Sequence, residues 1–235
     1  MSQSPSMPKS HGIIFQPDMI LAYLARTKDQ TRRVKGLKLI NQEPDAWQLI
    51  FTPKNEDIGF VSFGHKTDRS KKVVHVNFPY GKIGETLYFK ETWRAWEDPN
   101  MGEDFIKYRA DDMLISPVDF GWDPTRHHDW DHIVGKFDKW QSGMFMAQRF
   151  ARFRDVNILS VGIERLHDIS EHDAKWEGVT CPPPKGIIHY ASYRDEYFKL
   201  WDRINGKTLP ASKNPWVFVY KFPVYDRTYI KASEE

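Results

Sequence analysis

The sequence predicts an α+β protein: a small mixed, mostly antiparallel β-sheet or barrel with flanking helices. The expected elements run helix, several strands, two helices and a final strand. This order differs from the regular strand–helix alternation of a doubly wound parallel sheet. The 235 residues suit one domain with insertions. A hydrophobic content of 40%, with nine Trp and fifteen Phe, is enough to fill a sizeable core.

The first half of the chain is expected to form one helix followed by strands. In residues 16–26, Pro17 can occupy the first helical turn, and apolar residues recur at helical spacing. Strand-like segments follow at 31–40, 46–51, 58–65 and 71–78, with the second and third joined as a hairpin. Beyond two glycine turns, alternation puts Leu87, Phe89 and Glu91 on one face of a further strand.

The second half is expected to begin with a surface excursion. Residues 95–138 hold four Lys or Arg against eleven Asp or Glu and are rich in turn formers, so we expect little regular structure there. A strand region follows at 152–166. Ser170 can cap a short helix that Gly178 ends. A longer helix ending at 205–206 and a closing strand at 214–225 complete the order.

Composition and residue patterns indicate where the protein is located. No run of eighteen apolar residues is present, which argues against a membrane span. Residues 1–12 lack the apolar core of a signal peptide and are interpreted as a disordered leader. The single cysteine, Cys181, cannot form an intrachain disulfide, which fits a reducing cytoplasm. No activating neighbour of Cys181 points to catalysis.

The junction at 25–34, "ARTKDQTRRV", is the first candidate site. If one helical turn continued there, Lys28 and Thr31 would share a face. Lys28 could then act as a base for the Thr31 hydroxyl, provided that burial or nearby cations lower its pKa. Arg32 and Arg33 could bind phosphate or stabilise an oxyanion. The alternative is a solvated basic helix exit that complements the helix dipole.

Glu177 is the candidate carboxylate. It lies in the last turn of the expected helix 170–177, where the negative end of the helix dipole favours its protonated form. The neighbouring Trp176 can add desolvation. Both effects suit a proton-transfer role, and the alternative is an ordinary exposed glutamate.

A histidine-rich segment lies at 126–132, "RHHDWDH". Apart from its arginine and its tryptophan, every residue in it is of a type that can ligate a metal ion: His127, His128, Asp129, Asp131 and His132. Adjacent histidines on a loop rarely direct both rings to one ion. We therefore expect a solvated, pH-sensitive loop, with no metal and no cofactor.

Arginines and aromatic residues interleave at 149–154, "RFARFR". In a strand, Phe150, Arg152 and Arg154 would share one face and could contact bases and phosphates. The alternative is a half-buried strand whose arginines pair with the acidic residues 95–138. Further candidates of the same types are Trp93, Tyr108, Arg109 and Arg149.

These segments together resemble the ASCH domain, a PUA-like family common in phages and bacteria. Its hallmark runs approximately G-x-K-x-x-(E/T)-x-R, and Lys28, Thr31 and Arg33 occupy its last three positions. The resemblance continues, in the family's order, through "YGKIGETLYFKETW", "KYRAD", "VGIERLHDISEHDAKWEGV", "LWDRINGK" and "NPWVFV". Two departures are visible: Arg26 replaces the hallmark glycine, and Met146 to Arg152 differ from a stretch of the phage members.

The resemblance implies a small β-barrel with flanking helices and a cleft for RNA or a nucleoside. It implies one domain over residues 13–230, with insertions near 41–75 and 95–138. Some members hydrolyse N4-acetylcytidine with lysine, threonine and glutamate, which correspond here to Lys28, Thr31 and Glu177. Other members are reported as ribonucleases. A phage or prophage origin is implied as well.

Our expectation is therefore a cytoplasmic protein that hydrolyses an amide on a modified cytidine. The alternatives are a non-catalytic module for RNA or other single-stranded nucleic acid, and a metal-independent ribonuclease. The expected ligand contacts are Arg32, Arg33, Trp93, Tyr108, Arg109, Arg149 and Arg152. The sequence does not predict the oligomeric state.

Overall fold

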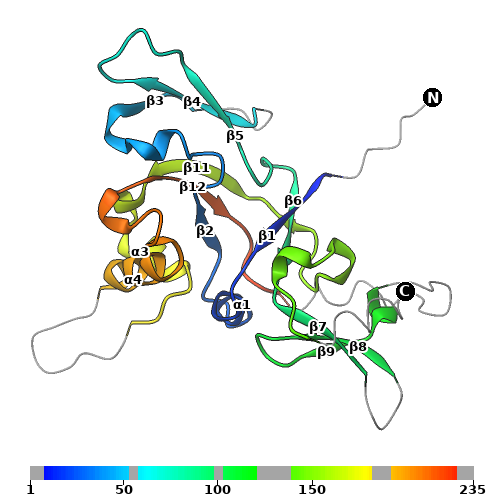
Figure 1. Ribbon diagram of the computed structural model, residues 1–235. Coiled ribbons are helices and arrows are strands. Elements are labelled where there is room, and N and C mark those ends of the chain that lie inside the picture. Colours follow the sequence, from blue (N-terminus) through cyan, green and yellow to red (C-terminus); the bar gives the residue numbers. More distant parts are fainter. Residues whose placement is uncertain (1–7, 53–57, 98–102, 121–138, 182–191, 227–235) are drawn as a thin grey trace, which may run out of the picture.

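A computed structural model describes residues 8–52, 58–97, 103–120, 139–181 and 192–226 (Figure 1). Its class is mixed α+β, as predicted. The described strands form four three-stranded sheets, and their pairing is antiparallel apart from one parallel pair. None of these sheets closes into a barrel within the described chain. No helix among the described residues is both long and apolar enough to cross a bilayer.

The central sheet contains the basic junction. It is built from β11 (Ser160–Arg165), β12 (Trp216–Lys221) and β2 (Gln30–Arg33), with β12 in the middle. The register pairs Arg32 with Val219 and Thr31 with Tyr220. Since paired residues share a face and successive residues alternate, Arg32 and Thr31 lie on opposite faces of this sheet.

Each face of the central sheet has its own hydrophobic core. The Tyr220 face joins the main core, which also contains Ile13, Phe89 and Phe153. The other face is covered by α3 (Glu171–Trp176) and α4 (Tyr193–Asn205), whose Ala174, Tyr197 and Trp201 pack with Val217 of β12 (Figure 1).

A second sheet lies across the main core. It consists of β1 (Ser10–Ile14), β6 (Thr86–Lys90) and β10 (Val156–Asn157), and β1 runs parallel to β6. The alternation predicted for β6 is confirmed, because Leu87 and Phe89 are fully buried. The predicted leader is wrong in part, since its last three residues belong to β1. Few side chains of β1 are buried, so its sequence lacks a clear strand pattern.

The third sheet projects from the molecule as an arm. It comprises β3 (Trp47–Phe51), β4 (Phe60–His65) and β5 (Val74–Asn77), and its predicted hairpin is confirmed (Figure 1). The strand predicted at 31–40 ends at Arg33. A turn around Gly36 and a short 3₁₀ helix at Ile40–Gln42 follow it.

The fourth sheet corrects the prediction of an irregular excursion at 95–138. It is formed by β7 (Trp93–Glu97), β8 (Asp104–Tyr108) and β9 (Leu114–Ile115). Each strand of this sheet has a buried apolar residue: Ala95, Ile106 and Ile115. Acidic residues at exposed positions nearby made the segment look irregular in the sequence. The strand predicted across 149–154 is also wrong, because Gln148–Phe150 form a 3₁₀ turn and an irregular segment follows.

The helices follow their predicted signals. In α1 (Pro17–Leu24), proline occupies the first turn, where its missing N–H leaves no hydrogen bond unmade. Ser170 caps α3 by accepting a hydrogen bond from the Asp173 amide. Gly178 ends α3 with a φ of +89°, a conformation that glycine adopts without steric cost.

Candidate functional site

Lys28 and Glu177 lie in direct contact, as two segments 149 residues apart form an isolated antiparallel β-bridge at these residues. The Lys28 Nζ donates to the Glu177 carboxylate at 3.0 Å, to the Glu177 carbonyl at 2.8 Å and to the Gln30 carbonyl at 2.7 Å. The exposure of Lys28 is 0%. All three protons of the ammonium group thus have acceptors inside the protein.

Arg32 extends this contact into a buried ion network. Its Nη1 donates to the Glu177 carboxylate at 2.9 Å, and its Nε donates to Glu164 at 2.7 Å. The guanidinium also lies over the ring of Tyr197 from α4. Glu177 therefore lies between two cations, and the network joins β2, β11 and the end of α3.

The turn at Gly178 makes this close approach possible. A Cβ at residue 178 would lie 2.6 Å from the Ala22 Cβ and 3.3 Å from the Lys28 Cβ. Only glycine fits between α1 and the bridge, so the residue that ends α3 also allows Glu177 to reach Lys28.

Burial dominates the electrostatics of Lys28. Desolvation lowers the pKa of Lys28, and the adjacent Glu177 carboxylate opposes this shift. The lowered pKa agrees with the direction that a basic role would need. The three donated hydrogen bonds, however, require the protonated ammonium form, which has no lone pair that could accept a proton from a substrate.

The expectation that Lys28 and Thr31 share a helical face is wrong. The chain is extended there, so three residues of separation place the two side chains on opposite sides. Thr31 is buried on the main-core side opposite Tyr220, whereas Lys28 contacts Glu177 with Arg32.

Arg33 lies on the same side of β2 as Thr31 and reaches a pocket. Its Nη2 donates to the Ile14 carbonyl, and its guanidinium lies over the Phe15 ring at 5.1 Å. The Arg33 Nε is buried and has no hydrogen-bond partner among the described residues. Burial lowers the pKa of Arg33. An unmatched buried donor on a cation is a place where an anionic acceptor would fit.

A pocket of about 250 Å³ opens beside Arg33. Its lining consists of Arg32, Arg33, Val34, Lys35, Tyr80, Trp201 and Asn205. The exposed Lys35 lies over the Tyr80 ring at 5.1 Å, and it forms no ion pair within the described chain. Three basic side chains and two aromatic side chains thus meet in one concave space, which we call the cationic pocket.

A second pocket, of about 600 Å³, lies between α1 and α4 and reaches Glu177. Its lining is largely apolar, with Met19, Leu200 and Val179 among the contributors. The charged groups at its rim pair with each other: Arg203 with Asp18, and Lys199 with Glu196. We call it the apolar pocket, because these pairs leave it no excess of positive charge.

Arg152 occupies a separate buried network and does not face either pocket. Its guanidinium makes a bidentate pair with Glu91 at 2.8 Å and a second pair with Asp111 at 2.7 Å. Its side chain is 1% exposed. The interpretation that arginines in this region pair with the acidic residues 95–138 is confirmed for Arg152, and its predicted ligand contact is not available in this structure.

The remaining predicted ligand contacts lie on the fourth sheet and its flank. Trp93 and Tyr108 face each other across β7 and β8 in a hydrophobic core and are 2% and 0% exposed. Neither ring is accessible to a base. Arg109 and Arg149 are exposed and lie over the rings of Trp140 and Phe150. None of these four residues lines either pocket.

The histidine-rich segment 126–132 lies outside the described residues. Within the described ranges, no three metal-ligating side chains form a group that could hold an ion.

Three residues of the candidate site were missed by the sequence prediction. Lys35 and Tyr80 line the cationic pocket, and Glu164 holds Arg32 in place. Lys35 continues the basic run of the junction and could have been included. Tyr80 lies 47 residues beyond Arg33 in the sequence, and no local pattern connects it to that run.

No family model, curated protein or solved structure matches this chain.

Proposed function

We propose that this protein is an ASCH-type, PUA-like domain that binds RNA or another single-stranded nucleic acid in the bacterial or phage-infected cytoplasm. The cationic pocket is the proposed nucleotide site. The observation that carries the proposal is the meeting of Arg33, Lys35 and Tyr80 in one pocket. The buried Nε of Arg33, which has no hydrogen-bond partner among the described residues, supports it.

The chemistry of this pocket suits one nucleotide unit. Arg33 can donate to a phosphate oxygen, and Lys35 adds a second positive charge. Tyr80 offers a ring on which a base can stack, an interaction that tolerates any base. Arg32 is already paired with Glu164 and Glu177, so it forms a fixed part of the pocket wall and adds no excess positive charge.

Two features of the junction support the ASCH relationship. Arg26 stands where the family hallmark has glycine, and its backbone has a φ of +59°, a region that favours glycine. The lysine and glutamate that correspond to the family's catalytic pair are in contact here.

The test is calorimetric titration with cytidine 5′-monophosphate and, in parallel, with cytidine. We expect cytidine 5′-monophosphate to bind more tightly than cytidine, and we expect Arg33→Ala or Lys35→Ala to weaken binding of the monophosphate by about tenfold. Tyr80→Ala should weaken binding of both ligands by a similar factor. Lys213→Ala, which removes an exposed cation elsewhere, is the control. Equal affinity for both ligands, or no effect of Arg33 and Lys35, would overturn the proposal.

A second candidate function is hydrolysis of an amide on a modified cytidine. The Lys28–Glu177 pair favours it, because this pair corresponds to the family's catalytic residues and Glu177 lines the apolar pocket. That pocket's volume suits a nucleoside. Catalysis would require Lys28 to release a hydrogen bond, and it would require Thr31 to be reached from the opposite side of β2.

Mass spectrometry of products tests this second candidate. The protein is incubated with N4-acetylcytidine and, separately, with a short RNA. Loss of acetyl by the wild type and not by Thr31→Val would establish the hydrolase. Intact N4-acetylcytidine under conditions where cytidine monophosphate binds would exclude it. Shortened RNA would indicate a ribonuclease instead.

A further inference from the structure

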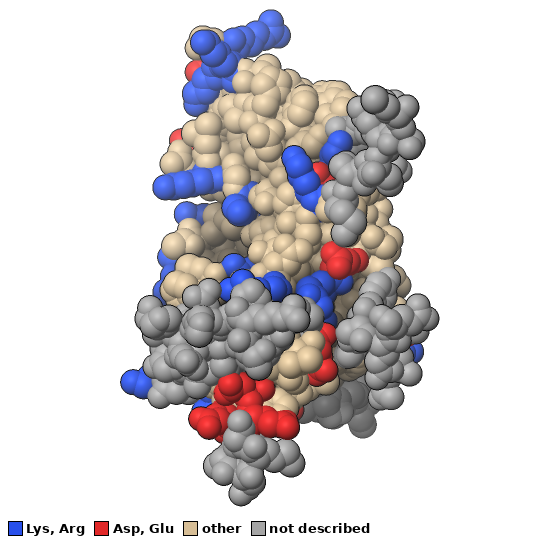
Figure 2. All heavy atoms as spheres, turned by 90° about the vertical axis from the view of Figure 1, so that its right-hand side faces the viewer, with Lys and Arg blue, Asp and Glu red and all other residues tan. Residues whose placement is uncertain are grey.

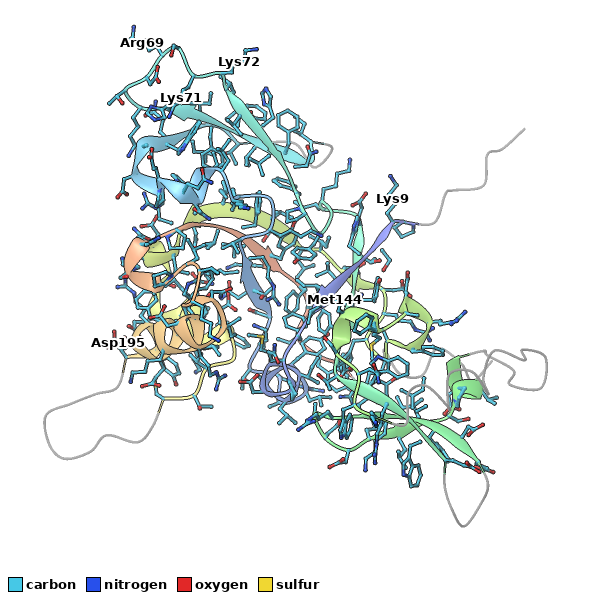
Figure 3. All side chains as sticks on the ribbon, viewed as in Figure 1. Lys9, Arg69, Lys71, Lys72, Met144 and Asp195 are labelled. Atoms are coloured by element: carbon cyan, nitrogen blue, oxygen red, sulfur yellow. The ribbon has the colours of Figure 1, made fainter. Side chains whose placement is uncertain are left out.

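The end of the projecting arm carries a cluster of exposed cations. Between β4 and β5, the chain turns through Lys66, Arg69, Lys71 and Lys72, which we call the basic tip. The sole acidic residue from 66 to 72 is Asp68. Figure 3 labels three of the cations at the outer end of the arm, and Figure 2 shows basic side chains gathered at this end of the molecule.

The cations of the basic tip form no ion pairs in the described part of the chain. Asp68 accepts hydrogen bonds from the amide and hydroxyl of Ser70, so its carboxylate is used within the turn. Lys71 lies over the Trp47 ring at 5.8 Å. The basic tip therefore presents positive charge that the fold itself does not use.

The basic tip and the cationic pocket are joined by β5. The chain runs from Lys72 through β5 to Tyr80, a span of at most about 26 Å for eight extended residues. The turn bearing Lys35 and Lys38 packs beside β5, since a Cβ on Gly36 would lie 3.3 Å from Val76. Lys35 and Lys38 are both exposed. Cations thus recur along one path from the tip to the pocket.

We propose that the basic tip binds the phosphate backbone of the same nucleic acid whose nucleotide occupies the cationic pocket. This inference rests on the proposed function and narrows its ligand class to a single-stranded polynucleotide. A mononucleotide in the pocket cannot reach the tip, whereas a strand of several nucleotides can. Proteins that bind single strands usually combine aromatic side chains, on which bases stack, with cations spaced along the nucleic-acid backbone.

An anionic membrane is the competing partner for such a tip, since Ile50 and Phe51 on β3 and Val73 just before β5 are exposed apolar residues. The continuity of the cations with the pocket favours the polynucleotide. Binding to a membrane would not require cations between the basic tip and Tyr80.

The test is fluorescence anisotropy with a labelled single-stranded RNA of about 20 nucleotides. The triple variant Arg69→Ala/Lys71→Ala/Lys72→Ala is compared with Lys175→Ala/Lys207→Ala/Lys213→Ala. Both variants remove three exposed cations, and the second set lies on α3 and after α4. We expect the tip variant to lose at least about tenfold in RNA affinity and to reduce the log–log salt slope by about 2. The control should change little.

Titration with cytidine 5′-monophosphate separates the two proposals. The tip variant should bind this nucleotide like the wild type. If the mononucleotide fails to bind while RNA binding still depends on the tip, the pocket proposal fails, and RNA binding by the tip stands without its link to the pocket. Equal RNA affinity in the tip variant and the wild type would overturn the tip proposal. Equal losses in both triple variants would overturn it too. Tip-dependent binding to phosphatidylserine vesicles, with RNA binding unaffected, would replace it with a membrane surface.

Discussion

The Glu177 carboxylate and the Lys28 ammonium are 3.0 Å apart, and both side chains are almost fully buried. Because Lys28 also donates to two backbone carbonyls, it connects the β2 segment to the end of α3. The pair that resembles a catalytic dyad therefore stabilises the fold around the cationic pocket as well.

Removing Lys28 should strongly destabilise the protein. Lys28→Met leaves Glu177 buried with Arg32 as its remaining cation and leaves two carbonyls without their donor. We expect the free energy of unfolding to fall by about 3–5 kcal/mol, as for other broken buried pairs. Urea denaturation monitored by tryptophan fluorescence measures this change.

A double variant separates the charge from the packing. Lys28→Met/Glu177→Gln removes both charges of the pair and should recover part of the loss seen in Lys28→Met. The exposed Lys199→Met serves as the control and should change stability by less than about 0.5 kcal/mol. A Lys28→Met loss as small as that of Lys199→Met would contradict a structural role for the pair.

Arg26 should respond to substitution according to its backbone. Its side chain is exposed and its φ is +59°, so Arg26→Gly removes a steric cost at the price of a more flexible unfolded chain. We expect Arg26→Gly to keep the free energy of unfolding within about 0.5 kcal/mol of the wild type. The β-branched Arg26→Val should lower it by about 1–2 kcal/mol. Equal effects of the two substitutions in urea titrations would refute this backbone argument.

We expect Asp173 to make the free energy of unfolding depend on pH in the acid range. Although burial acts in the opposite direction, hydrogen bonds from Ser170, Gln30 and Lys221 lower the pKa of Asp173 below its ordinary 3.8. Its stabilising effect is therefore complete above that value and is lost as the pH falls through the lowered pKa. Asp173→Asn should show a smaller loss of unfolding free energy between about pH 6 and pH 3. Parallel slopes for the variant and the wild type would show that Asp173 does not contribute.

Arg152 should matter for stability and not for ligand binding. Arg152→Met leaves Glu91 buried without its bidentate partner, so we expect a loss of about 3–5 kcal/mol in urea unfolding. At a temperature where the variant remains folded, its affinity for cytidine monophosphate should match that of the wild type. Weaker nucleotide binding by a folded Arg152→Met would return this residue to the ligand site.

Local signals predicted the elements that local interactions determine. Pro17 at the start of α1, Ser170 before α3 and the alternation around Phe89 each act within a few residues, and each is observed. The prediction that Lys28 and Thr31 share a face was wrong, because it depends on whether the chain at this junction is helical or extended. That geometry is set by pairing with β12 and by the bridge to Glu177, which lies far along the chain.

Some residues predicted to contact a ligand are instead buried inside the protein. Arg152 and Tyr108 belong to residue types that bind nucleic acid, yet tertiary packing places them inside. Glu91 on the buried face of an otherwise apolar alternation was the available signal, since a buried carboxylate requires a cation. The cationic pocket could not be predicted, because Tyr80 and Trp201 reach Arg33 only through the fold.

Photo-crosslinking with 4-thiouridine 5′-monophosphate, followed by peptide mass mapping, shows where on the protein a nucleotide binds. We predict adducts on peptides that contain Lys35 or Tyr80, and these adducts should be competed by unlabelled cytidine monophosphate and lost in Arg33→Ala. Adducts confined to α1 and residues 177–180 would place the ligand in the apolar pocket and contradict the proposed site.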